Sequence, residues 1–258
     1  MNNLNLENIV KNLIDTFLNA GKVAKEISVR GIKIKMKADN SPVTDGDIAV
    51  DKILQEKIKN LTPEIPIISE ETVDLNRINT HKTFWLIDPI DGTRDYIQKK
   101  EEYTINAALI IDLEPSIGII YAPAKDRLFF SYGENLAFEI SNEKKVKLNC
   151  KKKNIKEIIG LENSGKTTDE VLDIYKKYKV TKTLKMSSSL KFCILAAGEA
   201  DIYAANPRAF EWDIAAGHAI LIHAGGSLTT HENEKILYGK KNYKNLSIKA
   251  KRPGDLKI

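Results

Sequence analysis

Two carboxylates lie three residues apart in residues 84–95, which read Phe-Trp-Leu-Ile-Asp-Pro-Ile-Asp-Gly-Thr-Arg-Asp. An apolar run ends at Asp88, a proline fixes the next turn, and Asp91 and Thr93 precede a polar segment that can be helical. Hard cations such as Mg²⁺ prefer oxygen ligands, and a helix N-terminus favours an anion. The two carboxylates and the Ile90 carbonyl between them therefore predict a metal ion beside a phosphate.

A plain strand-to-helix turn is the simpler interpretation of the same residues. Proline and glycine form turns, and Asp91 alone would serve as a helix cap. A cap does not require a second carboxylate at the strand end, and burying Asp88 without a partner would be costly. The pair therefore favours the metal site.

Further acidic residues lie where apolar elements begin or end, namely Asp47, Glu70, Glu71 and Asp213. Taken singly, Asp47 and Asp213 fit helix caps, and the two glutamates fit an exposed surface. If Glu70 and Asp213 converge on the pair at Asp88, their repulsion must be offset. Two charges ~4 Å apart cost about 4 kcal/mol at an effective dielectric constant of about 20. Two or three Mg²⁺ ions between the carboxylates would offset that cost.

Residues 160–167 match the phosphate-binding pattern G-x-x-x-x-G-K-[ST], from Gly160 to Thr167. They follow a predicted strand and precede a predicted helix. In P-loop enzymes the strand that ends in Asp follows the glycine loop, whereas Asp88 precedes it here. We interpret the segment as a loop near the substrate and keep a P-loop kinase or ATPase as an alternative.

The bulk composition is that of a globular protein, with 258 residues of which 42% are hydrophobic and 29% charged. This length fits two packed halves. The net charge of +5 would steer an anionic substrate toward an acidic pocket, although a lysine-rich sequence bias explains it equally well. The basic residues are dispersed, and their one cluster, residues 151–153, is typical of a solvated loop. Nucleic acid is therefore not expected as a partner.

The cysteines and the N-terminal sequence indicate the cellular compartment in which the protein is expected. Cys150 and Cys193 do not form a disulfide framework or a metal-ligand spacing. The N-terminus lacks the charged and apolar regions of a signal peptide. No stretch approaches the ~20 apolar residues that span a bilayer. We expect a cytoplasmic protein without stable membrane insertion and leave open a peripheral association with the inner membrane.

Hydrophobic periodicity predicts the elements that position these residues. In the first half we expect helices over residues 5–28 and, after a turn at 41–47, from 48 to 58. Strands are expected at residues 32–36, 65–68, 84–87, 103–111, 116–121, 127–132 and 137–148. We place a boundary at residues 149–154, which gives an N-terminal half of residues 1–150 and a C-terminal half of residues 151–258. In the second half we expect helices at 168–179, 190–197 and 212–224, and strands at 155–159, 200–204, 226–229 and 246–250.

Two motifs resemble the signatures of the inositol monophosphatase superfamily of Mg²⁺-dependent, lithium-sensitive phosphatases. They are Asp-Pro-Ile-Asp-Gly-Thr from Asp88 and Trp-Asp-Ile-Ala-Ala-Gly from Trp212. Within the superfamily, the chain is most similar to the CysQ-type 3'(2'),5'-bisphosphate nucleotidases. Segments that resemble this subgroup are residues 37–44, 68–71, 121–123, 188–193 and 212–219. The Ser-Ser-Leu-Lys-Phe-Cys run at 188–193 is the most specific to it, and the resemblance covers nearly the whole chain.

The resemblance implies a layered αβαβα sandwich, an α+β fold whose cleft lies between the halves. It implies that the metals are held by Glu70, Asp88, the Ile90 carbonyl, Asp91 and Asp213. Asp47 and Thr93 would polarise the attacking water, and the amides of Gly92 and Thr93 would hold the scissile phosphate. Substrate contacts would come from Ser188, Lys191 and Arg208 in addition to the metal and phosphate ligands. The chain departs from the subgroup at Ala205, where a basic residue is expected.

The implied activity is release of the 3'-phosphate from adenosine 3',5'-bisphosphate to give AMP, and possible action on its 5'-phosphosulfate analogue. The implied cofactor is Mg²⁺, with Mn²⁺ as a substitute and Li⁺ and Ca²⁺ as inhibitors. Inositol monophosphatase or fructose-1,6-bisphosphatase activity would use the same carboxylates and stays open, as does a non-catalytic nucleotide sensor. The expected partner is a phosphorylated nucleotide, and the expected assembly is a monomer or a homodimer.

Overall fold

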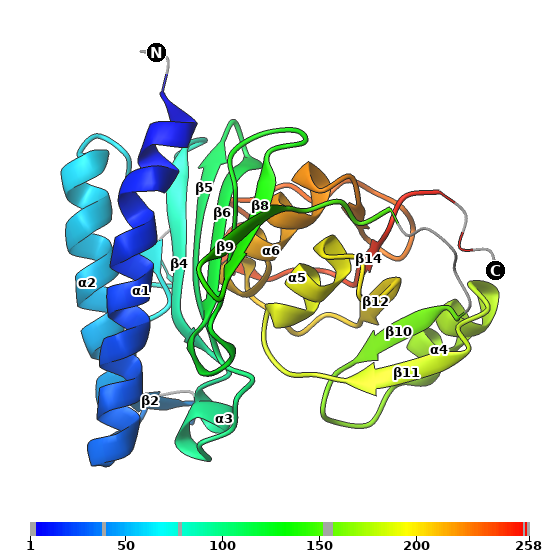
Figure 1. Cartoon of the computed structure of the whole chain (residues 1–258), viewed down its shortest axis with the longest axis horizontal. Helices are drawn as coiled ribbons and strands as arrows, with labels where there is room; N and C mark the ends of the chain where they lie inside the picture. The colour runs from blue at the N-terminus through cyan, green and yellow to red at the C-terminus, as the bar shows by residue number, and fades with distance from the viewer. Residues whose placement is uncertain (1–3, 38–39, 77–78, 152–156, 255, 257–258) are drawn as a thin grey trace.

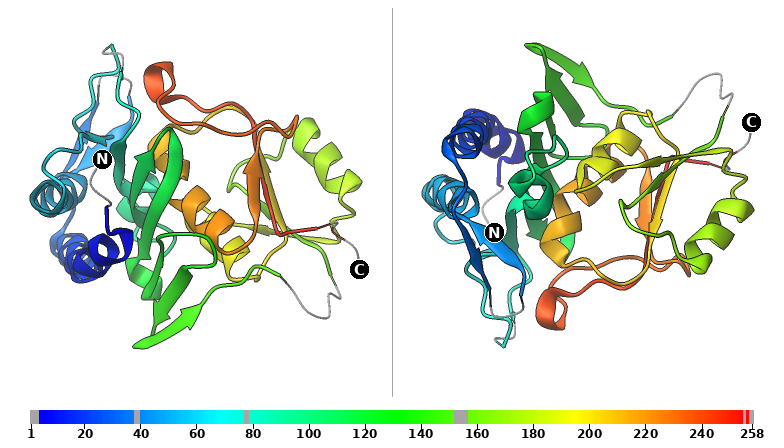
Figure 2. Two further views of the ribbon diagram at one scale, coloured as in Figure 1. Left: turned by 90° about the horizontal axis from the view of Figure 1, so that it is seen from above. Right: turned by 90° about the horizontal axis from the view of Figure 1, so that it is seen from below.

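Helical layers and sheets alternate across the molecule (Figures 1 and 2), in a computed structural model that describes residues 4–37, 40–76, 79–151, 157–254 and 256. Helices α1 (Leu6–Arg30) and α2 (Asp45–Leu61) cover one face of a seven-stranded sheet. Helices α5 (Leu190–Ala196) and α6 (Glu211–His223) lie between this sheet and a five-stranded sheet. Helix α4 (Asp169–Lys177) covers the far side. The predicted layered αβαβα sandwich is confirmed.

The larger sheet runs in the order β3-β4-β5-β6-β7-β8-β9. Its strands are β3 (Ile67–Ser69), β4 (Phe84–Asp91), β5 (Thr104–Ile111), β6 (Glu114–Ala122), β7 (Arg127–Ser131), β8 (Ala137–Ser141) and β9 (Lys144–Lys147). Strand β3 is parallel to β4, and the remaining pairs are antiparallel. The predicted strand at 84–87 was too short, because β4 continues to Asp91 through a register shift after Asp88.

Alternation along β4 decides where its first carboxylate points. Phe84 and Leu86 belong to the core beside α6, whereas Trp85 and Ile87 belong to the core beside α1 and α2. Successive side chains of a strand point to opposite faces, so Asp88 shares the face of Phe84 and Leu86. The strand therefore directs this carboxylate toward α6.

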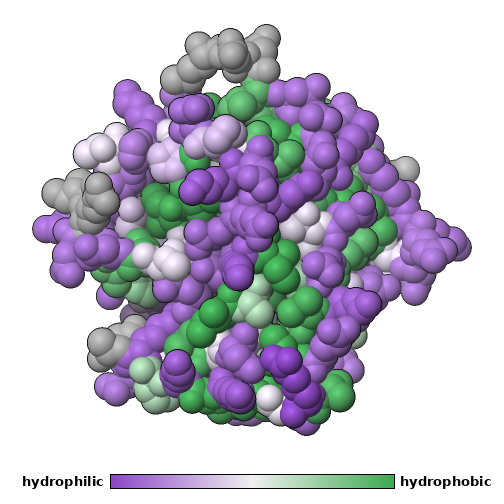
Figure 3. Space-filling view, turned by 90° about the vertical axis from the view of Figure 1, so that its left-hand side faces the viewer, coloured by the Kyte–Doolittle hydropathy of each residue, from purple (hydrophilic) through white to green (hydrophobic). Residues whose placement is uncertain are grey.

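The outer helices are amphipathic, as their sequence period predicts. Val10, Leu13 and Phe17 of α1 are fully buried against the sheet, and the outward face of the helical layer is largely hydrophilic (Figure 3). Gly21 allows close approach, because a Cβ atom there would lie 2.3 Å from the ring of Tyr121 in β6. Of the described helices, none combines the length and the apolar character that crossing a bilayer requires.

Helix α6 is apolar around its whole circumference, as expected for a helix enclosed between two sheets. It packs on β5 and β6, where Gly118 makes room for it. A Cβ atom at Gly118 would lie 2.2 Å from the backbone oxygen of Ala216 and 2.9 Å from the Cβ of Ala219. This close contact fixes the height of α6 on the sheet, and with it the position of Asp213.

The smaller sheet runs in the order β11-β10-β12-β14-β13. Its strands are β10 (Ile159–Glu162), β11 (Lys182–Lys185), β12 (Ile202–Ala205), β13 (Ser227–Thr229) and β14 (Ile248–Lys251). The prediction of a strand at 155–159 was wrong in position, because β10 begins at Ile159; residues 155 and 156 lie outside the described residues. Strand β11 was not predicted, because its four residues are all exposed at the sheet edge.

Short elements complete the fold: the hairpin of β1 (Ile34–Met36) and β2 (Pro42–Thr44), helix α3 (Thr93–Ile97), and the 3₁₀ turns η1 (Pro123–Lys125) and η2 (Lys241–Tyr243). The helix predicted after the turn at 41–47 begins at Asp45, directly after β2. The predicted boundary at 149–154 lies partly outside the described residues, as does the lysine cluster at 151–153. One core cluster joins Phe84 and Ala108 to Phe192 and Trp212 across that boundary.

Candidate active site

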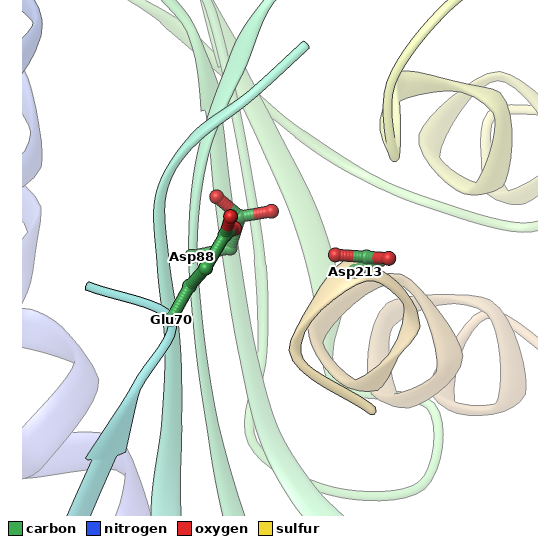
Figure 4. A group of neighbouring side chains, drawn as sticks. All are labelled: Glu70, Asp88 and Asp213. Carbon is green, nitrogen blue, oxygen red and sulfur yellow. The ribbon is translucent and has the colours of Figure 1, made fainter. Parts of the chain in front are cut away.

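Three carboxylates from separate elements converge at one point (Figure 4). Glu70 follows β3, Asp88 lies on β4, and Asp213 lies in the first turn of α6. One oxygen of each lies within 4.8 Å of the others. The Glu70 amide donates to the Ile87 carbonyl at 3.1 Å, which holds the end of β3 beside β4. The predicted convergence of these residues is therefore present.

Asp213 both caps helix α6 and belongs to the carboxylate group that could bind a metal ion. One carboxylate oxygen accepts the backbone amide of Phe210 at 2.7 Å, which satisfies a donor at the start of α6. This bond orients the side chain, whose carboxylate faces Glu70 and Asp88 (Figure 4). The capping bond thus helps to place the carboxylate in the cluster.

The electrostatics of the cluster call for a cation. Burial, and then the charges of Glu70, Asp91 and Asp213, raise the pKa of Asp88 well above its usual range. Burial, and then the charges of Asp91 and Glu70, raise the pKa of Asp213 well above its usual range. Within the described residues, Oδ1 of Asp88 is buried without a hydrogen-bond partner. The carboxylate oxygens repel one another, and one of them is buried without a partner. A hard divalent cation bound among them would relieve both penalties.

Asp91 lies beside the three-carboxylate group rather than within it. Its Oδ2 accepts the backbone amide of Ser189 at 2.5 Å, at the start of α5. Burial raises the pKa of Asp91 to about 6, although the Lys191 ammonium acts in the opposite direction. The charge of Asp91 also contributes to the raised pKa of Asp88. It can therefore share a cation with Asp88 while it joins β4 to α5.

Thr93 and Asp47 face each other, as the sequence predicts. The Thr93 hydroxyl lies 3.4 Å from Oδ1 of Asp47 and 3.1 Å from the Ile90 carbonyl oxygen, so it can donate to either. Oδ2 of Asp47 accepts the Thr44 amide at 2.8 Å and completes a capping box at the start of α2. Burial raises the pKa of Asp47 to about 6 despite these hydrogen bonds. Asp47 is thus a fixed acceptor behind the Thr93 hydroxyl.

A cavity of about 490 Å³ opens over the cluster. Eight of the predicted site residues line it: Glu70, Asp91, Gly92, Thr93, Ser188, Lys191, Arg208 and Asp213. The other three, Asp47, Asp88 and Ile90, are each 1% exposed and lie behind these residues. The sequence prediction therefore describes one continuous site.

Two cationic side chains, Lys191 and Arg208, line the same cavity as the carboxylates and interact with the charge of Asp91. The Lys191 ammonium donates to the Ser188 carbonyl at 2.6 Å and to the Met186 carbonyl at 3.3 Å, and burial lowers its pKa to about 8. Ser188 adopts a φ of 55°, a region uncommon for residues with a side chain and frequent at functional sites. Arg208 is exposed at the cavity rim. These cationic groups can attract an anion into the cavity.

Sequence reasoning missed a further residue of the site, Lys37. Its ammonium lies 3.0 Å from Oε1 of Glu70 and 2.9 Å from Oε1 of Glu71. Burial raises the pKa of Glu71 to about 7, whereas the two glutamates outweigh burial and raise the pKa of Lys37. Lys37 belongs to the segment 37–44 that resembles the nucleotidases, and this resemblance is the sequence feature that could have identified it as a site residue. Residues 38 and 39 of that segment lie outside the described residues.

Residues 160–167 do not form a P-loop. Gly160 lies inside β10, so the connection to α4 begins only after Glu162. Gly165 is not among the glycines with positive φ, and its surroundings are open. The segment still adjoins the cavity through Asn163 and Ser164, and its interpretation as a loop near the substrate stays a prediction.

Comparisons with known proteins show which family the chain is similar to. Residues 5–254 match the inositol monophosphatase family. The chain is 37% identical to the 3'(2'),5'-bisphosphate nucleotidase CysQ of Buchnera aphidicola subsp. Acyrthosiphon pisum over 82% of this chain and 79% of that protein. It is 31% identical to CysQ of Salmonella typhimurium, over 85% and 89% of the two chains.

A solved structure extends the likeness to the fold. The crystal structure of CysQ from Bacteroides thetaiotaomicron superposes with a TM-score of 0.78 at 29% identity, covering 97% of this chain and 99% of that one. Sequence, fold and carboxylate cluster therefore lead to one assignment: the chain belongs to the inositol monophosphatase family.

Proposed function

We propose that the protein is a Mg²⁺-dependent phosphatase that removes the 3'-phosphate of adenosine 3',5'-bisphosphate. The observation that carries this proposal is the convergence of Glu70, Asp88 and Asp213 around a buried, unpartnered oxygen of Asp88. The relatives named 3'(2'),5'-bisphosphate nucleotidase support the choice of substrate.

The metal ligands proposed are the carboxylates of Glu70, Asp88, Asp91 and Asp213 and the carbonyl of Ile90. Three of the five are held by backbone hydrogen bonds: Asp213 at the start of α6, Asp91 by the Ser189 amide, and Glu70 through its own amide at the edge of β4. A bound Mg²⁺ supplies Lewis acidity, which lowers the pKa of a water molecule and neutralises charge on phosphoryl oxygens. Phosphoryl transfer then depends mainly on positioning and charge neutralisation.

The proton of the attacking water is proposed to pass toward Thr93 and Asp47. The Thr93 hydroxyl accepts a hydrogen bond from the water while it donates its own proton toward Oδ1 of Asp47, 3.4 Å away. Asp47 cannot turn away, because its other oxygen is bound at the start of α2. The pair therefore aligns the water for attack.

The scissile phosphate is proposed to rest on the amides of Gly92 and Thr93. Gly92 adopts the left-handed conformation, with φ 90° and ψ 37°, and α3 begins at the next residue. Lys191, Ser188 and Arg208, which line the same cavity, would then bind the nucleotide and its 5'-phosphate. The cavity lies between residues of the two sequence halves, which supports their proposed division of labour.

The test is phosphate release by the purified protein with Mg²⁺ from three substrates: adenosine 3',5'-bisphosphate, inositol 1-phosphate and fructose 1,6-bisphosphate. We expect the highest kcat/KM for the bisphosphonucleotide and no release in EDTA. A preference for either sugar phosphate would refute the substrate assignment. Tight nucleotide binding without phosphate release would indicate a sensor instead. The same assay with Mn²⁺, Li⁺ or Ca²⁺ tests the predicted substitution and inhibition.

A further inference from the structure

The connection between β11 and α5, residues 186–189, forms part of the cavity wall, and we call it the serine segment. Ser187, Ser188 and Ser189 all line the cavity that holds the carboxylates. Gly92 lies beside this segment, because a Cβ atom at Gly92 would come within 3.6 Å of the Cβ of Ser188. The serine segment therefore adjoins the amides on which the scissile phosphate is proposed to rest.

The serine segment lies between a strand and a helix, and its conformation depends on contacts from outside. Ser188 adopts a φ of 55°, in the left-handed region that residues with a side chain rarely occupy. A conformation of this kind persists only where surrounding contacts hold it. Those contacts therefore decide where Ser188 lies in the cavity.

Two carboxylates hold the backbone on either side of Ser188. The Ser189 amide donates to Oδ2 of Asp91, and the Ser187 amide donates to Oε2 of Glu102 at 2.8 Å. Among the described residues that line the cavity, Asp91 is present and Glu102 is not. Asp91 is also a proposed metal ligand, whereas the proposed chemistry leaves Glu102 without a role.

The fold fixes Glu102 next to the phosphate site. The residue lies two positions before β5, whose Thr104 pairs with Asp91 of β4. The Thr104 hydroxyl lies 2.9 Å from the hydroxyl of Ser189. A Cβ atom at Gly92 would lie 3.4 Å from the backbone oxygen of Glu102. The backbone of Glu102 therefore lies against Gly92 while its carboxylate reaches the serine segment.

The position of Lys191 depends on the same segment. Its ammonium donates to the carbonyls of Met186 and Ser188, so it follows the serine segment wherever that segment lies. Burial lowers the pKa of Lys191, and the charges of Asp91 and Glu102 oppose that shift. A displaced segment would thus carry both Ser188 and Lys191 away from a bound nucleotide.

We propose that Glu102 is a positioning residue for the nucleotide. Through the Ser187 amide it holds the serine segment in the conformation that presents Ser188 and Lys191 to the substrate. Glu102 acts through the backbone of the segment rather than by contact with the substrate. This inference rests on the proposed function and deepens it, because it adds a residue that determines substrate affinity.

The test measures phosphate release from adenosine 3',5'-bisphosphate with Mg²⁺ in two variants of Glu102. In Glu102→Ala the Ser187 amide loses its acceptor, and we expect KM to rise about tenfold, the order of one hydrogen bond to a charged group. The values of kcat and of the Mg²⁺ activation constant should stay within about twofold. Glu102→Gln keeps an acceptor oxygen, so its KM should stay within about threefold. The matched control is Glu101→Ala, because this neighbouring side chain is 72% exposed and pairs with Lys125 at 3.6 Å.

Hydrogen exchange of the peptide that contains residues 186–190 reports on the segment without any substrate. In Glu102→Ala this peptide should exchange about tenfold faster, whereas it should keep its rate in Glu102→Gln and Glu101→Ala. An unchanged exchange rate or an unchanged KM in Glu102→Ala would overturn the inference. So would equal losses in the alanine and glutamine variants, or a Mg²⁺ constant that rises together with KM.

These outcomes separate the inference from the function on which it rests. If the unchanged protein releases no phosphate from the bisphosphonucleotide, the proposed function fails. Calorimetric titration of the same nucleotide then decides the role of Glu102. Weaker binding in Glu102→Ala than in Glu102→Gln would support it, and equal binding would refute it.

Discussion

Replacing Asp88 with asparagine removes one charge from the cluster and keeps the shape of the side chain. The three ligand oxygens lie within 4.8 Å of one another, so at an effective dielectric constant of ~20 each ionised neighbour repels Asp88 by about 3.5 kcal/mol. Without metal, the folded protein avoids most of this cost by binding protons, which is why the pKa of Asp88 is raised. In EDTA near neutral pH we therefore expect Asp88→Asn to raise the free energy of unfolding by only about 1–3 kcal/mol.

The raised pKa values fix the direction in which the stability of the metal-free protein changes with pH. Some carboxyl groups have a higher pKa in the folded state than in the unfolded state. Such a group contributes its full stabilisation of the fold only at pH values below its unfolded pKa, which is about 4. That contribution is lost as pH rises through the folded pKa. The folded pKa is about 6 for Asp91 and about 7 for Glu71, and it is raised for Asp88. The metal-free protein should thus lose stability between pH ~4 and pH ~7, and Asp88→Asn should lose less.

Urea unfolding in EDTA and in Mg²⁺, with phosphate release measured on the same samples, provides the assay. We expect the variant to be more stable than the unchanged protein in EDTA, to gain less stability from Mg²⁺, and to be inactive. Asp173→Asn is the control, because that carboxylate of α4 is exposed and pairs with the exposed Lys176 across a 2.8 Å contact. A variant that is less stable in EDTA, or that keeps the full Mg²⁺ response, would show that Asp88 is not a repelled metal ligand.

Three further changes test other parts of the structure. Thr93→Ala should lower kcat by about 10²–10⁴-fold with little change in the melting temperature. Thr93→Ser, which keeps the hydroxyl, should retain much of the kcat. Equal kcat values in the two variants would show that the Thr93 hydroxyl does not take part in proton transfer. Gly118→Ala should cost about 1–3 kcal/mol in urea unfolding, because its Cβ would lie 2.2 Å from the α6 backbone, whereas Gly165→Ala in open space should be neutral. Arg252→Met should cost about 3–5 kcal/mol in urea unfolding, because it removes the guanidinium whose Nε lies 2.6 Å from the fully buried carboxylate of Asp201. A neutral result would contradict the importance of that pair.

Most of the fold could be predicted from the sequence because its elements carry strong hydrophobic patterns. The nearly continuous apolar runs of β5 and β6 and the helical spacing of apolar residues in α1 are of this kind. Strand β11 was missed because Lys182–Lys185 is exposed at an edge, where no burial pattern forms. The end of β4 was misplaced because Asp88 interrupts the apolar run, although the strand continues to Asp91.

The carboxylates could be predicted from residue type and position, but their partners could not. Asp91 accepts an amide from Ser189, 98 residues away, and no local pattern indicates that contact. Lys37 approaches Glu70 from a hairpin, and only the tertiary structure shows the contact. The sequence thus indicates which groups do chemistry, whereas the fold determines what restrains them. The oligomeric state and the cytoplasmic location stay predictions.

The position of α6 has a consequence for biosynthesis. The seven-stranded sheet is complete once residue 147 has left the ribosome, yet the helix that covers its inner face begins only at residue 211. Until α6 has been translated, the apolar face that carries Phe84, Leu86 and Ala108 lacks its cover, and exposed apolar surface of this kind favours aggregation. Asp213 arrives with the same helix, so the carboxylates are crowded together only in the last stage of maturation.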